Sequence, residues 1–265
     1  MFLSKNAVTK TVVTSVMFLI IGALFIGLSV FLSAGGQKYA PSLIAGIVFC
    51  SLAVINALVG IYSEGITKVF ARGCKLVRDE LDPEAFIAYY NGVSRSANAV
   101  SRPTYDISEL LLTAYELSGN MRGKQAQLAH MRSALKPKYL PRITVLEACR
   151  AYDDGDADEG DRLLSLAGKE YPPSVTVSTM IDIAGKTSAA ICRGDLKTAE
   201  SYYNGVLNGS GIMKPDNAAR LMAHWELFRI SEQNGDTEKA LEHLRFCAEN
   251  GGRTAIRSKA LSLLK

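Results

Sequence analysis

Two long apolar stretches without a charged residue stand near the start of the chain, before a region where polar and apolar positions recur with helical spacing. The first runs from Thr11 to Gln37 and the second from Tyr39 to Ser63. Each is long enough for the roughly 20-residue helix that crosses about 30 Å of hydrocarbon. The link between them contains glycine and proline, which indicates a turn. We therefore expect membrane-spanning helices over about residues 12–32 and 42–62, packed as an antiparallel hairpin.

Two other interpretations of the apolar stretches are less favoured. The charged start, with Lys5 and Lys10, is typical of a secretory signal peptide, but the apolar run exceeds the roughly 7–15 residues usual for one. The second stretch would in any case retain the chain in the membrane. A buried hairpin in a soluble protein is disfavoured because two consecutive charge-free stretches of this length are hard to bury in a small domain.

The distribution of Lys and Arg predicts the orientation of the hairpin, because basic loops are retained in the cytoplasm. Lys5 and Lys10 precede the first stretch, and the link holds only Lys38. Four basic residues follow the second stretch: Lys68, Arg72, Lys75 and Arg78. We expect an integral membrane protein with both termini in the cytoplasm. The five cysteines form no C-x-x-C pair and are interpreted as isolated reduced thiols.

The net charge of +4 does not indicate nucleic-acid binding. Seven of the 30 basic residues and one of the 26 acidic residues lie before residue 79, which leaves 23 basic and 25 acidic residues after it. Affinity for nucleic acid comes mainly from neutralising phosphates, and the region after the hairpin has no excess positive charge for this. The basic cluster after the second stretch is better explained as a topology signal that lies against lipid headgroups.

The region after the hairpin shows periodic punctuation. The pairs Gly119-Asn120, Gly155-Asp156, Gly194-Asp195 and Gly235-Asp236 are separated by 36, 39 and 41 residues, and each stands between two amphipathic stretches. Glycine can end a helix in a left-handed conformation, and Asp or Asn can then cap the next helix. Each pair therefore predicts the turn of a helical hairpin, and the spacing predicts a repeat protein.

The residues after each glycine recur as well. A small residue stands five positions later and a bulky residue four positions after that: Gly160, Ala199 and Ala240, then Leu164, Tyr203 and Leu244. In these features the sequence from about Tyr105 to Asn250 resembles the tetratricopeptide repeat family. It departs from the family in three ways, because Lys124 occupies the small position of the first unit, the Trp-Leu-Gly-Tyr signature is absent, and the periods exceed the usual length.

The predicted fold class is all-α. We expect a transmembrane hairpin over residues 1–63, a basic juxtamembrane linker helix over 64–81, and a tetratricopeptide-like α-solenoid of about four units over 82–265. A single hairpin cannot bury its apolar face, whereas several stacked hairpins can. The expected first helices of the units are Tyr105–Leu117, Leu140–Tyr152, Thr179–Arg193 and Asn217–Gln233, preceded by a helix over Glu84–Ser94 and followed by one over Thr254–Leu264.

Several short motifs suggest chemistry that their surroundings do not support. Gly185-Lys186-Thr187 ends like a phosphate loop, but Met180 stands where the first glycine is required and no strand precedes it. The acidic run from Asp153 to Asp161 lacks the carboxylate that a calcium loop needs at its twelfth position. The histidines, His130, His224 and His243, have no zinc-ligand spacing. We predict no catalytic activity, no metal and no small-molecule cofactor.

The resemblance implies a membrane-anchored scaffold or adaptor that binds a protein or peptide on the concave surface made by the first helices. Carried over by position, that surface would include Arg142, Tyr152, Asp153, Trp225, Arg229, Glu232 and Gln233. The alternative for Trp225 is a position in the core, because large aromatic side chains contribute much of the buried area of proteins.

Three further hypotheses about function are kept. The chain could be an accessory subunit of a transport or secretion complex, in which case Asn56 would contact a foreign helix, because polar side chains in lipid usually face another helix. Missing motifs are weak evidence against an enzyme of unrecognised type. A homo-oligomer could form through the small residues Gly22, Gly27 and Gly46.

Overall fold

A computed structural model describes residues 5–35, 40–96, 104–169, 174–209 and 214–265. Over these residues every regular element is a helix and none is a strand, which confirms the all-α prediction. The chain divides into two compact units, one formed by Met1–Ala71 with Ala97–Ser101 and the other by Arg72–Ser96 with Arg102–Lys265. Each unit is described by itself.

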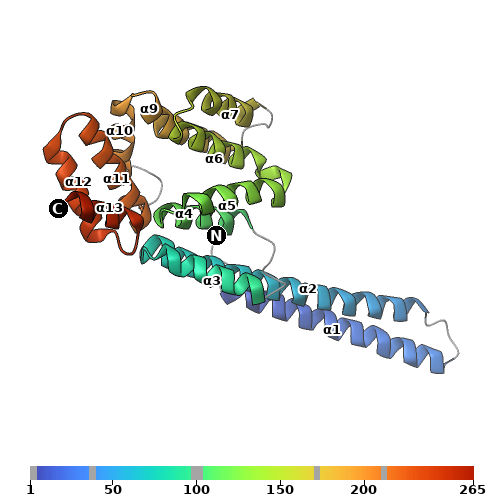
Figure 1. Cartoon of the computed structure of the whole chain (residues 1–265). Coiled ribbons are helices and arrows are strands. Elements are labelled where there is room, and N and C mark those ends of the chain that lie inside the picture. Colours follow the sequence, from blue (N-terminus) through green and yellow to red (C-terminus); the bar gives the residue numbers. More distant parts are fainter. Residues whose placement is uncertain (1–4, 36–39, 97–103, 170–173, 210–213) are drawn as a thin grey trace. The chain divides into compact units, whose positions relative to one another are not determined.

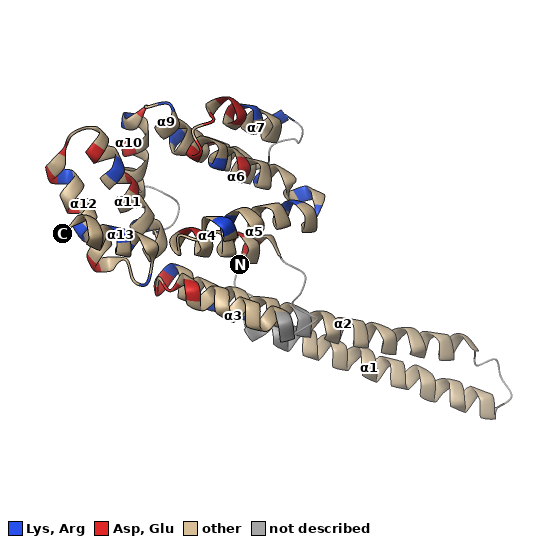
Figure 2. Ribbon diagram, viewed as in Figure 1, with Lys and Arg blue, Asp and Glu red and all other residues tan. Residues whose placement is uncertain are grey.

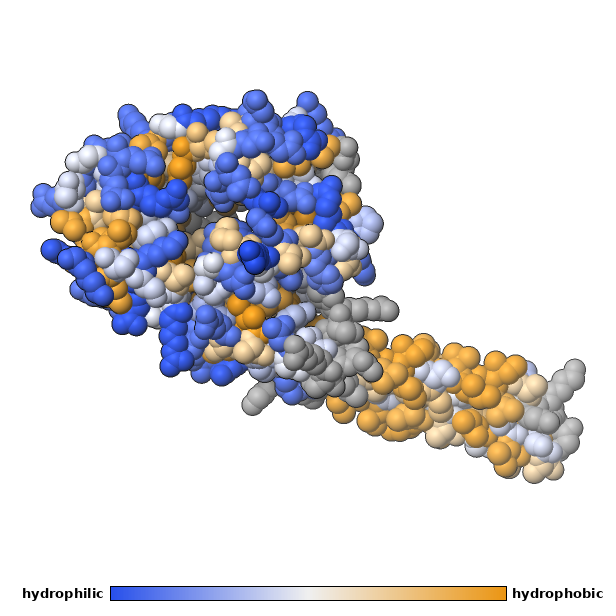
Figure 3. Space-filling model, in the orientation of Figure 1, coloured by the Kyte–Doolittle hydropathy of each residue, from blue (hydrophilic) through white to orange (hydrophobic). Residues whose placement is uncertain are grey.

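The first unit is a pair of long apolar helices, α1 (Lys5–Ala34) and α2 (Ala40–Gly73), of which α2 extends beyond this unit. Both are long and apolar enough to cross a membrane. A core helix of a soluble protein would be mostly buried, but only 17% and 12% of their most apolar segments are buried within the chain. Large side chains such as Leu24 and Phe31 are open along the helices, and Figure 3 shows an almost continuous apolar surface there.

Small and polar residues hold α1 against α2. A Cβ atom added at Gly22 would lie 3.0 Å from the carbonyl oxygen of Gly46, so the two backbones approach closely at this pair of glycines. Gly22 and Gly46 are therefore used inside the hairpin, and of the three small residues considered for self-association only Gly27 has open space around it. The amide of Asn56 donates hydrogen bonds to the Thr11 carbonyl oxygen at 3.1 Å and to the Ser15 hydroxyl at 2.9 Å.

The second unit begins with a helix that changes its winding. After α2 ends at Gly73, the π-helix η1 continues over Cys74–Asp79, and α3 runs from Pro83 to Ser96. A side chain at Gly73 would meet the ring of Phe86 at 2.6 Å, so a glycine lets α3 approach this helix. Leu81, in the bend between η1 and α3, has a φ of 53°, a left-handed conformation that is unusual for leucine.

Four helical hairpins follow. The first is α4 (Tyr105–Leu117) with α5 (Met121–Ala134), and the second is α6 (Leu140–Asp153) with α7 (Ala157–Lys169). The third has a divided first helix, α8 (Val175–Lys186) and α9 (Ser188–Cys192), followed by α10 (Leu196–Leu207), and the fourth is α11 (Asn217–Gln233) with α12 (Thr237–Asn250). The short 3₁₀-helix η2 (Pro137–Tyr139) precedes α6, and α13 (Ala255–Leu263) ends the chain (Figure 1).

The four predicted turns share one hydrogen-bonding pattern. Gly119, Gly155, Gly194 and Gly235 have φ between 71° and 84° and follow a helix that they terminate. In the last hairpin the Gly235 N–H donates to the Glu232 carbonyl oxygen, and the Asp236 N–H donates to the Ser231 carbonyl oxygen. These bonds satisfy free carbonyls at the end of α11. The side chains of Asn120, Asp156, Asp195 and Asp236 then each accept the N–H three residues ahead.

The small positions after these turns are buried where two helices cross. Ala199 and Ala240 are 0% and 4% exposed, and a side chain at Gly160 would meet the Tyr152 ring at 2.5 Å. In the first helical hairpin, α4 and α5, this role belongs to Gly123, whose added Cβ would lie 2.5 Å from the Tyr115 ring. The small residue of that hairpin thus lies one position before Lys124, which explains why Lys124 departs from the pattern.

In the third helical hairpin, the prediction of one continuous helix over Thr179–Arg193 was wrong. Its first helix begins earlier, at Val175, and is interrupted at Thr187, where φ is −116° and ψ is −98°. The Thr187 hydroxyl donates to the Ile183 carbonyl oxygen at 2.8 Å, four residues back. Such a side-chain bond competes with the helical backbone and is associated with helix bending.

The last hairpin returns to the segment that precedes the first. Helix α11 packs on η1, and η1 also contacts α3 and α4. The Asn217 side chain donates to the Asp79 carbonyl oxygen at 2.8 Å, and Arg78 faces the Asp216 carboxylate at 3.7 Å. The hairpins of the second unit therefore form a closed ring (Figure 1).

A tight turn after α12 completes this closure. The backbone N–H of Arg253 donates to the Leu81 carbonyl oxygen at 2.8 Å, and its guanidinium bonds the Asp82 carboxylate at 2.9 Å. Gly252 has a φ of +57°, and a Cβ there would lie 2.5 Å from the Leu81 Cβ. Residues about 170 positions apart are thus fixed together at a point where only glycine fits.

Candidate interaction site

An enclosed groove of about 420 Å³ lies within the second unit between α4, α5 and α6. This volume is within the range of small-ligand and side-chain pockets. Apolar side chains from all three helices line it: Leu112, Met121, Leu128 and Leu146. We call this cavity the inner groove.

Charged residues of η1, α4, α5 and α6 line the inner groove, among them Arg78, Glu116 and Asp153. Figure 2 shows charged residues distributed over the helices of this unit. Glu116 of α4 pairs with Lys124 of α5 at 3.1 Å, and Glu226 of α11 pairs with Arg229 at 2.9 Å. Desolvation raises the pKa of Asp153 and the pKa of Glu226, and the negative charge of Glu116 raises both further. Carboxylates from α4, α6 and α11 therefore share one electrostatic environment, which opposes ionisation of Asp153 and Glu226.

A further carboxylate, Glu109, lines another side of the groove next to the buried Tyr105. The Tyr105 hydroxyl donates to the Glu109 carboxylate at 3.2 Å, and the Arg142 guanidinium lies 5.2 Å from the centre of the Tyr105 ring. Desolvation raises the pKa of Glu109, although its hydrogen bond with Tyr105 opposes this shift. Of these polar groups only Glu109 lines the groove, whereas Tyr105 is 3% exposed and fixes the carboxylate from the core.

The structure brings some of the predicted surface residues together and separates others. Asp153 lines the inner groove, and the charge of Arg229 lowers the pKa of Asp153, so the two lie near one another. Arg142 lies over the buried Tyr105 ring and is not among the residues that line the inner groove. Tyr152 does not belong to the surface, because its ring is buried against Gly160 between α6 and α7 and its hydroxyl donates to Asp161 at 2.5 Å.

The predicted residues of α11 are dispersed along that helix. Trp225 is half-buried and tilted against Phe228, with ring centres 5.3 Å apart, so it is neither fully core nor fully surface. Glu232 and Gln233 are exposed in the last turn of α11. Sequence reasoning missed Glu116 and Glu226, and the only signal that pointed to this place was Lys124 at a position expected to be small.

A pair of histidines joins α11 to α12 in the last unit. The Nδ1 atoms of His224 and His243 are 2.9 Å apart, which fits one shared proton in a hydrogen bond. Cys247, four residues after His243, is buried and points to the Leu221 carbonyl oxygen, 3.9 Å away. Among the described residues no group of three or more His, Cys, Asp or Glu side chains could hold a metal ion.

This histidine pair predicts a loss of stability in mild acid. Desolvation lowers the pKa of His224 to about 4 and lowers the pKa of His243, because both rings are partly buried. Since the pKa of an unfolded histidine is about 6.5, the unfolded chain binds more protons between roughly pH 4 and 6.5, and stability falls as the pH falls through this window. Because the rings are partly open to solvent, we expect the free energy of unfolding to fall by about 1 kcal/mol, which corresponds to a fall of about 2–4 °C in thermal midpoint.

The control for this prediction is a protein without the pair. Between pH 7 and pH 5, the thermal midpoint of the His224→Gln, His243→Gln protein should fall less than that of the wild type, because its remaining titrating groups are the same. Equal falls in the two proteins would show that the histidine pair does not couple folding to pH.

Comparison of the chain with protein-family models, with curated proteins and with solved structures finds no match.

Proposed function

We propose that the chain is a membrane-anchored protein-interaction module. Helices α1 and α2 span the bilayer as a hairpin, and the helical hairpins of the second unit form a tetratricopeptide-like domain in the cytoplasm that binds a protein or peptide partner. The observation that carries this proposal is the inner groove, where charged side chains of α4, α5 and α6 line an apolar floor and Arg229 of α11 lies near the groove residue Asp153. We propose no catalytic activity and no cofactor.

The hydrogen bonds of Asn56 favour a hairpin that anchors the chain over one that recognises other membrane helices. Both hydrogen bonds of its amide nitrogen go to α1 of the same hairpin. In lipid a polar side chain that is satisfied within its own hairpin gains less from a foreign helix. An accessory role in a transport or secretion complex therefore remains the second candidate, and it would operate through the cytoplasmic repeats.

The membrane topology can be tested with reporter fusions. A reporter active only outside the cytoplasm should be active when fused after Lys38 and inactive when fused after Lys265, because basic residues flank the hairpin on the cytoplasmic side. Reversing the charges that follow the second apolar stretch, at Lys68, Arg72, Lys75 and Arg78, should weaken this preference. Activity of the fusion after Lys265 in the unmodified chain would refute the topology.

The interaction function can be tested by crosslinking in membranes, purification in mild detergent and identification of the co-purified protein. We expect a partner that is retained by the wild type and lost from the Asp153→Arg, Arg229→Glu variant, in which the charges of a groove residue and of its neighbour on α11 are reversed. Glu232→Lys is the matched control, because Glu232 is exposed at the end of α11. Recovery of the same proteins with the hairpin alone would overturn the proposal.

A further inference from the structure

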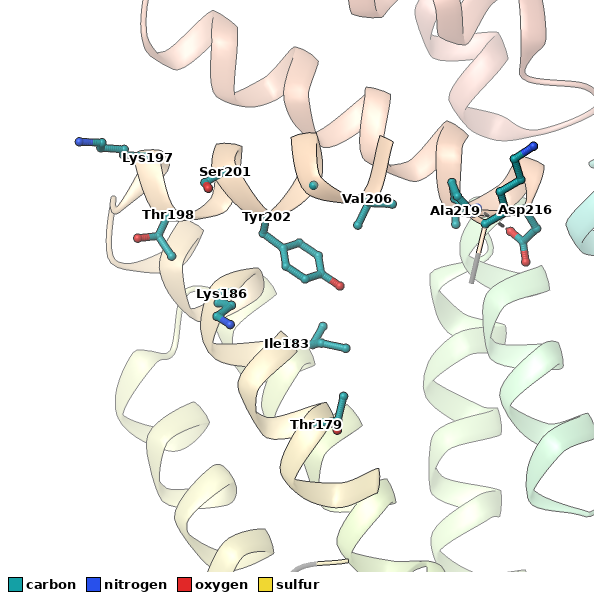
Figure 4. A pocket seen from close by; sticks show the side chains of 13 residues that line it. Thr179, Ile183, Lys186, Lys197, Thr198, Ser201, Tyr202, Val206, Asp216 and Ala219 are labelled. Carbon is teal, nitrogen blue, oxygen red and sulfur yellow. Dashed lines mark hydrogen bonds between the residues drawn. The ribbon is translucent and has the colours of Figure 1, made fainter. Parts of the chain in front are cut away.

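The third repeat unit carries a second, more open groove of about 970 Å³, between α8, α10 and the start of α11. Figure 4 shows it from close by, with Thr179, Ile183 and Lys186 on one side and Lys197, Ser201 and Tyr202 on the other. We call it the outer groove. It is distinct from the inner groove, because the two share no lining residue.

The interruption at Thr187 explains why this groove exists. In the other three units the first helix is continuous and packs along the second, as α6 does on α7 and α11 on α12. In the third unit α10 packs mainly on the short α9 and on α11, and it meets α8 at only a few residues. The facing sides of α8 and α10 are consequently left without a covering helix among the described residues.

The floor of the outer groove is apolar. Ile183 is 37% exposed, and Tyr202 extends from α10 toward it in Figure 4. Val206 and Ala219 continue the same surface toward α11. A groove with an apolar floor is one kind of surface on which an amphipathic helix lays its apolar face.

The charge around the outer groove is positive. Its lining includes Lys186, Lys197 and Lys214, with Asp216 as the only carboxylate. Asp216 already accepts the N–H of Ala219 at 2.8 Å, as the cap of α11. Lys186 pairs with Asp182 at 2.7 Å, but neither Lys197 nor Lys214 forms an ion pair within the described part of the chain.

We infer that the outer groove receives the apolar face of an amphipathic helix with acidic flanks from a partner protein, an inference that rests on the proposed interaction function. The apolar floor supplies the contact area, and Lys197 and Lys214 select acidic residues beside the apolar stripe. The segment of α8 from Thr179 to Lys186 extends about 10 Å, which matches about two turns of a bound helix.

The test uses the full chain in discs of neutral phosphatidylcholine and three labelled 14-residue helical peptides. The peptides share one leucine stripe and carry Glu, Gln or Lys on both flanks, and empty discs measure their binding to lipid. By fluorescence anisotropy we expect the Glu peptide to bind about tenfold more tightly than the Lys peptide, with the Gln peptide between them, because several exposed charge pairs each contribute modestly.

Variants separate recognition from damage to the fold. Lys197→Glu with Lys214→Glu should reverse the order of the three peptides, a result that misfolding cannot produce. Ile183→Asn should weaken all three peptides about equally, and Lys259→Glu, an exposed change on α13, should leave the order unchanged. An order that is the same in the wild type and in the double lysine variant would overturn the inference.

Other occupants would give different results, each of which overturns the inference. A second copy of the chain would appear as a dimer that Ile183→Asn dissociates, with no binding of any peptide. Anionic lipid would appear as binding to phosphatidylserine vesicles that depends on Lys197 and Lys214, again with no peptide binding. The proposed function fails independently, because its partner is lost on changing Asp153 of the inner groove and the neighbouring Arg229, which these peptides do not probe.

Discussion

Replacing Ala199 or Ala240 with leucine is expected to lower the thermal midpoint of the protein by about 3–10 °C. Ala199 is 0% exposed and contacts Ala190 and Ile230, and Ala240 is 4% exposed between α11 and α12. Added methylene groups in such a packed crossing cost about 1–3 kcal/mol, and 1 kcal/mol shifts the midpoint of a domain of this size by about 2–4 °C. The measurement is far-UV circular dichroism of the intact protein in mild detergent.

Matched controls lie two residues before each alanine. Lys197 and Glu238 are exposed in the same helices, so Lys197→Leu and Glu238→Leu should change stability by no more than about 0.5 kcal/mol. Similar losses at all four positions would mean that burial at the helix crossings does not set the stability of the repeats. The assignment of Ala199 and Ala240 to equivalent repeat positions would then have to be withdrawn.

Replacing Gly252 with valine is expected to open the ring and to lower the midpoint by about 4–12 °C. The backbone there has a φ of +57°, which a β-branched residue adopts only with strain. The added side chain would also meet the Leu81 Cβ at 2.5 Å and its carbonyl oxygen at 2.8 Å. The same Leu81 oxygen accepts the N–H of Arg253, so the substitution disrupts both the packing and the hydrogen bond of the closure.

A glycine elsewhere in the second unit provides the comparison. Gly185 lies within α8, and a Cβ added there would have nothing within 4 Å. Gly185→Ala should therefore raise stability slightly, by about 0.5–1 kcal/mol, because alanine restricts the unfolded chain. If Gly252→Val proved as harmless as Gly185→Ala, the contact between the last turn and Leu81 would not hold the ring closed.

Local signals in the sequence were sufficient to predict the boundaries of several helices of the second unit, but not those of α2, which runs to Gly73 where a separate linker helix over 64–81 was expected. Helices α4 and α11 have the predicted bounds, and α6 differs by one residue, because a glycine that ends a helix and a cap that begins the next act within one turn of chain. Helix α13 also differs from its predicted bounds by only one residue at each end. Its cap is the Thr254 hydroxyl, which accepts the N–H of Arg257 at 3.3 Å. Such bonds depend on few residues and leave a direct trace in the sequence.

Features that depend on distant residues were missed. The interruption at Thr187 occurs in a stretch with good helical spacing, and no proline marks it. Tyr152 has the spacing of a surface residue, but the missing side chain of Gly160 makes room for its ring between α6 and α7. Carboxylates of α4, α6 and α11 likewise lie near one another, and their proximity follows from how the hairpins are arranged in space, which periodicity alone does not specify.

Closure of the ring also limits how this architecture can change in evolution. An open solenoid can gain or lose a unit at either end, because each unit contacts only its neighbours. Here α11 must reach η1, and Arg253 must reach Leu81, so an inserted or deleted hairpin would move the last unit away from its seat. Duplication of single repeats should therefore be disfavoured in this lineage, and variation in length should be confined to the loops between hairpins.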